Sequence, residues 1–349
     1  MEYKIGLIGC GTVGRGLLEI LLKKDEYLKD KFDFEAKIVA ICDKLKGSLL
    51  IPDGINLKKL LELLEQGKKI GDYLKGGTNE AEGMDPHEMI EKSETQIIAE
   101  LTYTDIKTAE PATSYIRKAL RAGKHVVTSN KGPAALYYGE LRELAKKNNL
   151  FFRIEGTVMS GTPVFSLFEN GLAGNQVKEI RGILNGTTNF ILTKMEEDNM
   201  DYKEALQLAQ KLGYAEADPK ADVEGYDALA KIVILSNVLL EGNIAPSDVK
   251  REGIVSLSKK DILAAKEGGF RYKLIAQAKK EGNQVKASVS PQKLPLSDPL
   301  AGISGIFNAL TFDLDLMGKI TIQGPGAGKI ETGYSILSDM LAIHRHFSR

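Results

Sequence analysis

The chain has 349 residues, of which 43% are hydrophobic, and its 47 basic residues are balanced by 47 acidic ones. This length exceeds what one hydrophobic core usually supports, so we expect two domains. The balanced charge provides no basic surface for nucleic acid or for an anionic membrane, so neither is an expected partner. A membrane-spanning helix needs roughly 18 apolar residues in succession, and no stretch of the sequence reaches that length. With no cleavage-type leader at the N-terminus either, we expect a cytoplasmic protein.

The cysteines and histidines offer neither a disulfide framework nor a zinc spacing. Cys10 and Cys42 fall at the ends of the first two predicted strands, where small buried thiols are common. His344 and His346 are expected on a solvated helix end. No histidine or cysteine is therefore a candidate metal ligand.

The first element is a short apolar strand over residues 3–8, followed by a G-x-G-x-x-G turn and a helix. In such a turn the first glycine permits the tight bend, the second lets a pyrophosphate approach the backbone, and the third lets helix and strand pack closely. Free N–H groups and the positive end of the helix then face the phosphates. The expected cofactor contacts here are Gly9, Gly11, Thr12, Val13 and Gly14.

A second strand over residues 36–42 ends at Asp43. A carboxylate at this place can accept hydrogen bonds from the ribose 2′-OH of the adenosine, which favours NAD. Lys44 and Lys46 follow at once and could instead neutralise the 2′-phosphate of NADP, and Asp43 could simply cap the loop. The sequence therefore leaves NAD and NADP both open.

The rest of this half continues the strand–helix alternation. A strand over 96–101 ends at Thr102, a helix over 109–122 is closed by Gly123, and a strand over 125–128 leads to Lys131. The following Pro133 favours a helix start, so Lys131 is expected at a strand-to-helix switch on the ligand edge of the sheet, unless it is only a solvated charge. Residues 150–154 predict the last strand of the nucleotide domain.

The second half begins with a strand over 177–184 and a helix for which Asn185, Thr187 and Thr188 are N-cap candidates. A further helix opens on a capping box from Asp201 and stops at Gly213. The prolines between residues 289 and 300 indicate an edge strand and loop.

The most informative segment is residues 209–231, where a turn is pinned by two glycines and a proline and carries Glu216, Asp218, Asp222, Asp227 and Lys231. Asp227 and Lys231 are four apart on a helix, so their side chains can meet. The apolar run over 232–235 implies that this helix is buried. An acid and an ammonium at the mouth of a buried helix suit proton transfer, whereas a solvated pair would be worth only a few tenths of a kcal/mol.

The pattern Ala-x3-Gly-Tyr-x3-Asp-Pro-x2-Asp-Val-x-Gly-x-Asp-x3-Lys over residues 209–231 closely resembles the homoserine dehydrogenase signature. Four further segments are similar to that family: the Asn-Lys loop, the E-x-x-V segment from Glu155, the Asn-Gly-Thr run and the Gln-Gly-Pro-Gly-Ala-Gly segment from Gln323. Tyr103 and Thr104 depart from it, because the family usually has a glycine pair there.

The resemblance implies a role for each residue that matches the family motifs. Lys231 would donate and accept the proton, with Asp227 and Lys131 as the other catalytic residues, and Asp227 would favour the charged form of the Lys231 amine. The implied substrate-binding residues are Glu216, Asp222, Asp227 and Lys131. Beyond the glycine turn and Asp43, the implied cofactor contacts are Thr102, Lys131, Gly213 and Gly328.

The resemblance also implies a monovalent cation, usually described as sodium, although a purely structural turn remains the alternative. Hard cations prefer oxygen ligands. The implied ligands are Glu155 and the carbonyl oxygens of Val158, Ser160 and Thr162.

We therefore expect an α/β protein with a Rossmann-type parallel-sheet nucleotide-binding domain (1–153 with 323–349) and an α+β substrate-binding and dimerisation domain with a mixed sheet (154–322). The resemblance implies a homodimer that interconverts L-aspartate 4-semialdehyde and L-homoserine with NAD or NADP, in threonine, methionine and isoleucine biosynthesis. A short form, without an appended regulatory domain or aspartate kinase fusion, is expected. The alternatives are a related dehydrogenase of another small amino acid or aldehyde and a nucleotide-sensing protein without catalysis.

Overall fold

The computed structural model describes residues 1–74 and 83–348, in two compact units. Unit 1 is Met1–Gly161 together with the C-terminal segment from Gly328, and unit 2 is Thr162–Ala327. The sequence indicates 1–153 with 323–349 for the nucleotide domain and 154–322 for the substrate domain. Residue 349 lies outside the described residues.

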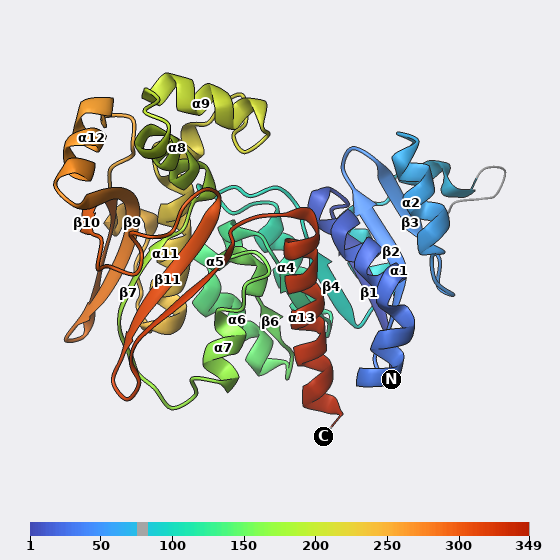
Figure 1. The fold of residues 1–349 in the computed structure, drawn as a ribbon. Coiled ribbons are helices and arrows are strands. Elements are labelled where there is room, and N and C mark those ends of the chain that lie inside the picture. The colour runs from blue at the N-terminus through green and yellow to red at the C-terminus, as the bar shows by residue number, and fades with distance from the viewer. Residues whose placement is uncertain (75–82, 349) are drawn as a thin grey trace. The chain divides into compact units, whose positions relative to one another are not determined.

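Unit 1 is built on a six-stranded sheet in the order β3-β2-β1-β4-β5-β6 (Figure 1). Its strands are β1 (Glu2–Ile8), β2 (Glu35–Asp43), β3 (Gly47–Leu50), β4 (Ile97–Glu100), β5 (His125–Thr128) and β6 (Phe152–Arg153). All neighbouring strands are parallel except β3, which returns antiparallel beside β2. This is the strand order of a Rossmann-type fold and confirms the predicted fold of the nucleotide domain. The short β3 was not anticipated.

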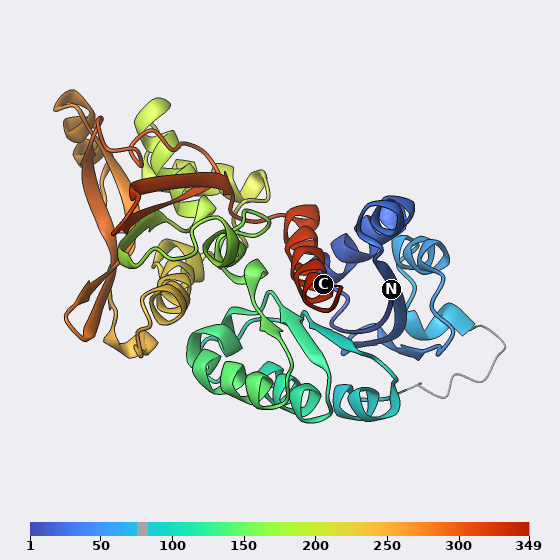
Figure 2. The same ribbon diagram turned by 90° about the horizontal axis from the view of Figure 1, so that it is seen from below.

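The helices of unit 1 are α1 (Thr12–Phe32), α2 (Leu57–Glu65), α3 (Pro86–Lys92), α4 (Ala112–Arg121), α5 (Lys131–Leu136), α6 (Tyr138–Lys147) and α13 (Lys329–Phe347), with short 3-10 turns η1 (Ile70–Leu74) and η2 (Glu155–Thr157). Figures 1 and 2 show α13 beside α1. Glycines permit this close approach, because a Cβ on Gly16 would lie 2.0 Å from the Lys329 carbonyl oxygen and one on Gly333 would lie 2.6 Å from the Leu17 nitrogen. The C-terminal helix thus completes the core of the first unit.

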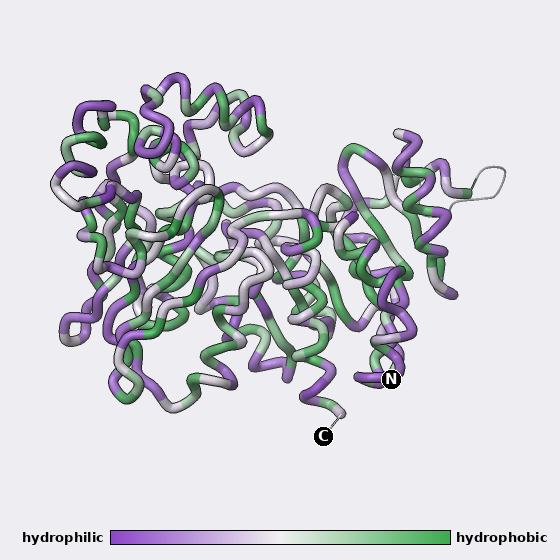
Figure 3. Tube along the Cα trace, viewed as in Figure 1, coloured by the Kyte–Doolittle hydropathy of each residue, from purple (hydrophilic) through white to green (hydrophobic). Residues whose placement is uncertain are grey.

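Hydrophobic residues line the strands of this sheet and the inner faces of its helices, as the hydropathy colouring in Figure 3 illustrates. Ile5, Leu7, Leu17 and Ile336 belong to one buried cluster, so elements from both ends of the chain share a core. The thiols of Cys10 and Cys42 are free and buried, as predicted.

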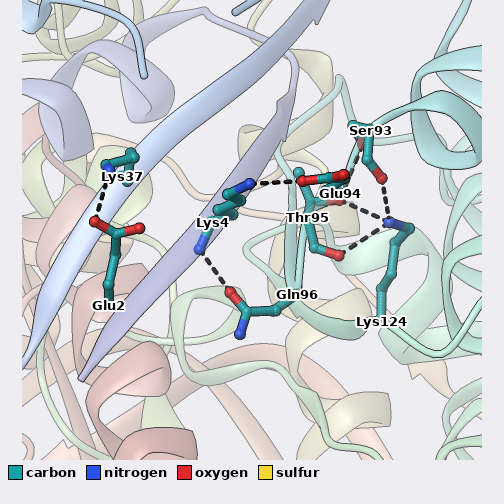
Figure 4. Close-up of polar contacts among 8 residues, drawn as sticks. All are labelled: Glu2, Lys4, Lys37, Ser93, Glu94, Thr95, Gln96 and Lys124. Atoms are coloured by element: carbon teal, nitrogen blue, oxygen red, sulfur yellow. Dashed lines mark hydrogen bonds and ion pairs between the residues drawn. The ribbon is translucent and has the colours of Figure 1, made fainter. Parts of the chain in front are cut away.

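A polar network closes the amino ends of the strands in unit 1 (Figure 4). The buried Lys124 ammonium donates to the carbonyls of Ser93 and Thr95, at 2.7 and 2.9 Å, and to the Thr95 hydroxyl at 3.0 Å. Burial lowers the pKa of Lys124. Nearby, Lys4 pairs with Glu94 at 2.6 Å. Ligands of parallel sheets bind at the opposite, carboxyl ends of the strands, so we interpret this network as structural.

Unit 2 contains a second six-stranded sheet, in the order β12-β11-β7-β9-β10-β8. Its strands are β7 (Val177–Ile183), β8 (Lys250–Arg251), β9 (Phe270–Glu281), β10 (Gln284–Pro295), β11 (Phe307–Leu314) and β12 (Gly318–Pro325). The pairs are antiparallel except β10 with β8, so the sheet is mixed, as predicted.

The helices of unit 2 are α7 (Phe165–Asn170), α8 (Gly186–Glu197), α9 (Tyr202–Lys211), α10 (Lys220–Val223), α11 (Tyr226–Leu239) and α12 (Lys259–Glu267), with one 3-10 turn, η3 (Pro246–Asp248). Helix α11 packs on β9 and β10. Its residues Ile232, Val233, Ile234 and Leu235 are all 0% exposed, which confirms the burial that the apolar run predicted. The capping box at Asp201 is also confirmed.

One prediction needs correction. His344 is not on a solvated helix end: it is 2% exposed, and its Nε2 lies 2.7 Å from the Phe32 carbonyl oxygen. The neighbouring ring of Phe34 covers it, because α13 packs against the core rather than fraying into solvent. The predicted edge strand is confirmed for Pro291 and Pro295 of β10, which have only β9 beside them along the described chain, because β8 pairs with Ser288 and Val289 and goes no further.

Of the described helices, none has the length and apolarity that a membrane span requires.

Candidate active site

The glycine turn after β1 combines two structural glycines with one that is sterically open. Gly9 has a φ of +95°, and a Cβ there would lie 2.5 Å from the Leu101 carbonyl oxygen. A Cβ on Gly14 would lie 2.8 Å from the Gly9 carbonyl oxygen, whereas one on Gly11 would meet nothing within 4 Å. Thr12 and Val13 begin α1, whose first turn has no side-chain cap. The open backbone at Gly11 and the uncapped helix start therefore suit a phosphate group.

Asp43 and Lys46 bind the backbone of Cys10 in this turn, Asp43 at its N–H and Lys46 at its carbonyl. The Cys10 N–H donates to Asp43 Oδ2 at 2.8 Å, and Lys46 Nζ donates to the Cys10 carbonyl at 2.7 Å. Asp43 Oδ1 accepts from the N–H groups of Leu45 and Lys46, at 3.0 Å each. Burial opposes ionisation of Asp43, but the N–H of Cys10 and its other donors, with the Lys46 charge, hold its pKa below the usual value. Asp43 thus caps the loop, one of the two roles considered for it.

A buried acid that the sequence analysis missed lies at the carboxyl end of β4. Glu100 is 0% exposed; its Oε1 accepts from the Thr102 N–H at 3.0 Å, and its Oε2 accepts from the Thr128 hydroxyl at 3.0 Å. Burial raises the pKa of Glu100. The available signal was an acid ending an otherwise apolar strand. Glu100 fixes the loop containing Thr102, one of the expected cofactor contacts.

Lys131 is the first residue of α5 and is half-buried at the carboxyl end of β5. The preceding Asn130 caps this helix by accepting from the Gly132 N–H at 3.1 Å, and donates to the Tyr103 carbonyl at 3.0 Å. Asn130 therefore connects the Lys131 turn to the loop after β4. Tyr103, which departs from the family glycine pair, is 63% exposed.

In unit 2, the structure brings Lys231, Asp227 and Asp222 together. Lys231 is 6% exposed; its Nζ lies 2.8 Å from Asp227 Oδ2 and donates to the Leu184 carbonyl at 2.7 Å. Two of the three ammonium protons thus have acceptors, and the third has none among the described residues. Burial, then the charge of Asp227, raises the pKa of Asp222. This arrangement places a buried lysine amine against a carboxylate and a backbone carbonyl, with a second carboxylate nearby.

Asn185 joins this cluster, although the sequence analysis considered it only as a helix cap. Its Oδ1 accepts from the Thr188 N–H at 2.9 Å and so caps α8. Its Nδ2 donates to Asp222 Oδ1 at 2.6 Å and to Asp227 Oδ2 at 3.0 Å. The signal was present in the Asn-Gly-Thr motif, but spacing alone does not reveal which residues an asparagine contacts.

The expected residues on the turn before α10 do not join the hydrogen-bonded cluster. Glu216 is exposed, and its backbone oxygen accepts from Gln210 Nε2 at 3.1 Å. Gly213 and Gly225 have φ of +77° and +83°, which explains the two glycines. Both positions pin the turn, as predicted.

Two family models match the chain. The model described as "Homoserine dehydrogenase, NAD binding domain" matches residues 9–155, and the model described as "Homoserine dehydrogenase" matches residues 163–341. An NAD(+)-dependent homoserine dehydrogenase of Pseudomonas canavaninivorans is 44% identical over 349 residues, covering 100% of this chain and 98% of the relative. The chain belongs to the homoserine dehydrogenase family.

Solved structures of homoserine dehydrogenases agree with this assignment. A putative homoserine dehydrogenase from Archaeoglobus fulgidus has a TM-score of 0.86 at 36% identity, with 98% of this chain and 99% of that chain covered. A hyperthermophilic archaeal homoserine dehydrogenase in complex with NADPH has a TM-score of 0.82 at 32% identity, with 99% of both chains covered. The chain is therefore an NAD(P)-dependent oxidoreductase, as predicted.

The segment expected to hold a cation is largely buried. Glu155, Val158 and Ser160 are 2%, 1% and 3% exposed and belong to unit 1, whereas Thr162 is the first residue of unit 2. The Glu155 N–H donates to Asp339 Oδ2 at 2.9 Å. Among the described residues, no group of three or more His, Cys, Asp or Glu side chains could hold a metal ion. A cation here would thus need backbone oxygens in addition to any side-chain ligand.

Gly328 is the N-cap of α13 and has a φ of +150°, a conformation that favours glycine.

Proposed function

We propose that this chain interconverts L-aspartate 4-semialdehyde and L-homoserine, with Lys231 exchanging the proton of the substrate oxygen. The observation that carries this proposal is the Lys231 ammonium, which is 6% exposed, held by Asp227 and Leu184, and left with one N–H unpartnered among the described residues. A bound nicotinamide supplies or accepts the hydride. In the threonine, methionine and isoleucine pathways, homoserine formation is the corresponding step.

We assign the residues around Lys231 to charge stabilisation and to substrate binding. Asp227 keeps a negative charge against the ammonium, which favours the protonated donor. Asp222 provides a second carboxylate for the amino group of the substrate, and we assign the exposed Glu216 to the same group. Lys131, in unit 1, would contact the polar end of the substrate. Proton transfer by a positioned side chain typically contributes a factor of about 10² to 10⁴.

We assign the cofactor site to the glycine turn of Gly9, Gly11 and Gly14 with Thr12, Val13 and Asp43, and to the loops of Thr102 and Lys131; the further contacts Gly213 and Gly328 rest on family resemblance alone. The open backbone of Gly11 supports this assignment, because a methyl group there touches no protein atom yet would obstruct a pyrophosphate. Gly11→Ala should therefore fold normally while raising the KM for the cofactor at least about tenfold, roughly the loss of one good contact. An unchanged KM would argue against the site.

We propose that NAD is preferred over NADP. Asp43 is ionised at the end of β2, and one of the two lysines, Lys46, is already bound to the Cys10 carbonyl and paired with Asp43 at 3.6 Å. Only Lys44, which is exposed, remains to attract a 2′-phosphate. The NAD(+)-dependent relative from Pseudomonas supports this preference. Steady-state kcat/KM values with NADH and NADPH side by side test it, and a preference for NADPH would refute it.

We propose that Glu155, with the carbonyls of Val158, Ser160 and Thr162, binds a monovalent cation, for which the family suggests sodium. A buried carboxylate is consistent with a counter-charge in an oxygen-ligand site. Replacing choline chloride by sodium chloride at equal ionic strength should raise the melting temperature of the wild type but not of Glu155→Gln. An equal response of both proteins would contradict the site.

We also propose a homodimer formed through unit 2. The apolar side chains of Phe307, Leu316 and Met317, at β11 and its turn to β12, are 43%, 74% and 62% exposed, which is consistent with a covered surface. Light scattering after gel filtration should give a mass near twice that of the chain; a monomer would refute the assembly.

The substrate test is a coupled assay. Turnover with L-aspartate 4-semialdehyde should exceed that with other short aldehydes, and L-homoserine should be oxidised in the reverse direction. Absence of turnover on both compounds, in a protein that binds the cofactor, would favour the related-dehydrogenase alternative.

A further inference from the structure

We propose that Asn185 is a positioning residue for the acidic pocket, holding Asp222 and Asp227 side by side with one side-chain amide while its oxygen anchors them to the start of α8. This inference rests on the proposed function, because it concerns how the substrate-binding carboxylates are arranged.

The hydrogen-bonding groups of Asn185 are fully used. It is 4% exposed, and its two amide protons go to carboxylates on two different helices, α10 and α11. Its oxygen accepts from both the N–H and the hydroxyl of Thr188, at 2.9 and 3.0 Å. A flipped amide would place its oxygen against two carboxylates, so the contacts define one orientation. The Asn185 side chain therefore makes hydrogen bonds to three helices, α8, α10 and α11.

The two hydrogen bonds from Asn185 reduce the repulsion between the two carboxylates. Asp222 and Asp227 are like charges in a partly buried site, where each disfavours ionisation of the other. The charged groups that act on Asp222 are Asp227 and Lys231, both on α11. Two N–H dipoles placed between the carboxylates offset their repulsion without introducing a competing positive charge. The pocket thus stays anionic and available for a substrate ammonium.

The same turn also orients the proton donor. Leu184, immediately before Asn185, provides the carbonyl that accepts from Lys231 Nζ at 2.7 Å. The end of β7 therefore places two neighbouring residues against both parts of the cluster: Leu184 against the ammonium and Asn185 against the acids. Movement of this turn would disturb proton transfer and substrate binding together.

The test replaces Asn185 by Ser, which can still cap a helix but is too short to bridge two carboxylates. The matched control is Asn56→Ser at the start of α2, where Asn56 Oδ1 accepts from the Lys59 N–H at 3.0 Å. The readout is the pH profile of kcat/KM for the reduction of L-aspartate 4-semialdehyde. In this direction Lys231 is the proton donor, so the fall of kcat/KM at low pH (the acidic limb) reports protonation of the carboxylates, and loss of a cap alone does not move it.

We expect the acidic limb of Asn185→Ser to move upward by about one pH unit, the size of a lost hydrogen bond to a carboxylate, with a roughly tenfold lower kcat/KM at neutral pH. The control should match the wild type. In an Asp222→Asn background, where the repulsion and one of the two bridged carboxylates are gone, Asn185→Ser should move the acidic limb less than it does with Asp222 in place. Should Asn185→Ser fail to fold, Asn185→Asp keeps the cap but adds a third negative charge, and should shift the limb in the same direction.

Different variants test the positioning role of Asn185 and the proposed function. If Asn185→Ser or Asn185→Asp folds and keeps the acidic limb of the wild type, while Lys231→Ala is inactive, the positioning role of Asn185 is wrong but the proposed function stands. Full activity of Lys231→Ala overturns the proposed function itself.

Discussion

Two helices of this protein carry the same local motif, an aspartate followed four residues later by a lysine, in very different surroundings. On α1, Asp25 and Lys29 pair at 3.0 Å with side chains 51% and 40% exposed. On α11, Asp227 and Lys231 pair at 2.8 Å with side chains only 16% and 8% exposed. The spacing and the contact are nearly identical, so neither distinguishes a surface ion pair from a candidate catalytic pair.

The difference lies in what surrounds each pair. Lys29 also pairs with Glu35, at 3.0 Å and on the surface, where solvent screens both contacts. Lys231 is surrounded by α11 residues with no exposure and donates to a buried carbonyl. In a low-dielectric environment, the same charges interact more strongly and are less free to rearrange. Spacing brings the two groups together, but burial provides the environment that the proposed proton transfer needs.

The sharpest test of this contrast is alanine at each lysine. Lys231→Ala should reduce kcat by about two orders of magnitude or more, the usual contribution of a general acid. Its cofactor affinity should stay within a few-fold, measured by nucleotide titration. Lys29→Ala should have wild-type kcat, and a comparable loss in both variants would remove the distinction between the pairs.

Neutralising the acid of each pair tests the role of the counter-charge. Asp227→Asn keeps the shape but leaves the buried ammonium and the Asn185 amide with a weaker partner. We expect kcat/KM to fall at least about tenfold and stability to fall by about 1–3 kcal/mol. Asp25→Asn should change stability by less than about 0.5 kcal/mol, as surface substitutions usually do. Denaturant unfolding and steady-state kinetics measure both effects; an unaffected Asp227→Asn would contradict a buried role.

Asp222, the second carboxylate of the buried cluster, should lower the stability of the folded protein at neutral pH. Burial, with the charge of Asp227, raises the pKa of Asp222 in the folded state. Such a group favours folding below its unfolded pKa, and this contribution is lost as pH rises through the folded value. Asp222→Asn should therefore melt higher than the wild type at pH 7, by about 2 °C, but equally near pH 3, while activity falls. Melting curves at the two pH values test the sign, and a lower melting temperature at pH 7 would reverse it.

The smallest expected effect is the coupling within the exposed pair. A double-mutant cycle on Asp25 and Lys29 should give about 0.3–0.5 kcal/mol at low salt, less in 1 M salt. The same cycle on Asp227 and Lys231 should give a larger coupling that salt changes little. Equal couplings with equal salt dependence would mean that burial does not separate the pairs.

Local sequence patterns were sufficient for the elements whose geometry is itself local. The glycines at 9, 11 and 14 and the alternation of strands and helices predicted the Rossmann-type unit, and the capping box at Asp201 predicted the start of α9, whereas the mixed sheet of unit 2 was expected only from the family resemblance. Positive φ at Gly213 and Gly225 follows from the same reasoning. These features depend on steric limits that act within a few residues.

Tertiary structure alone decided which polar side chains meet. Asn185 and Asp222 are 37 residues apart, and Lys231 is 47 residues from Leu184, yet they form one cluster. Likewise, the sequence left Asp43 with two possible roles, and only the folded loop revealed its bond to Cys10. The burial of Glu100 and of His344 also depends on neighbours far along the chain. A residue's type fixes which hydrogen bonds it can make, but packing fixes which partner it finds and how much water surrounds them.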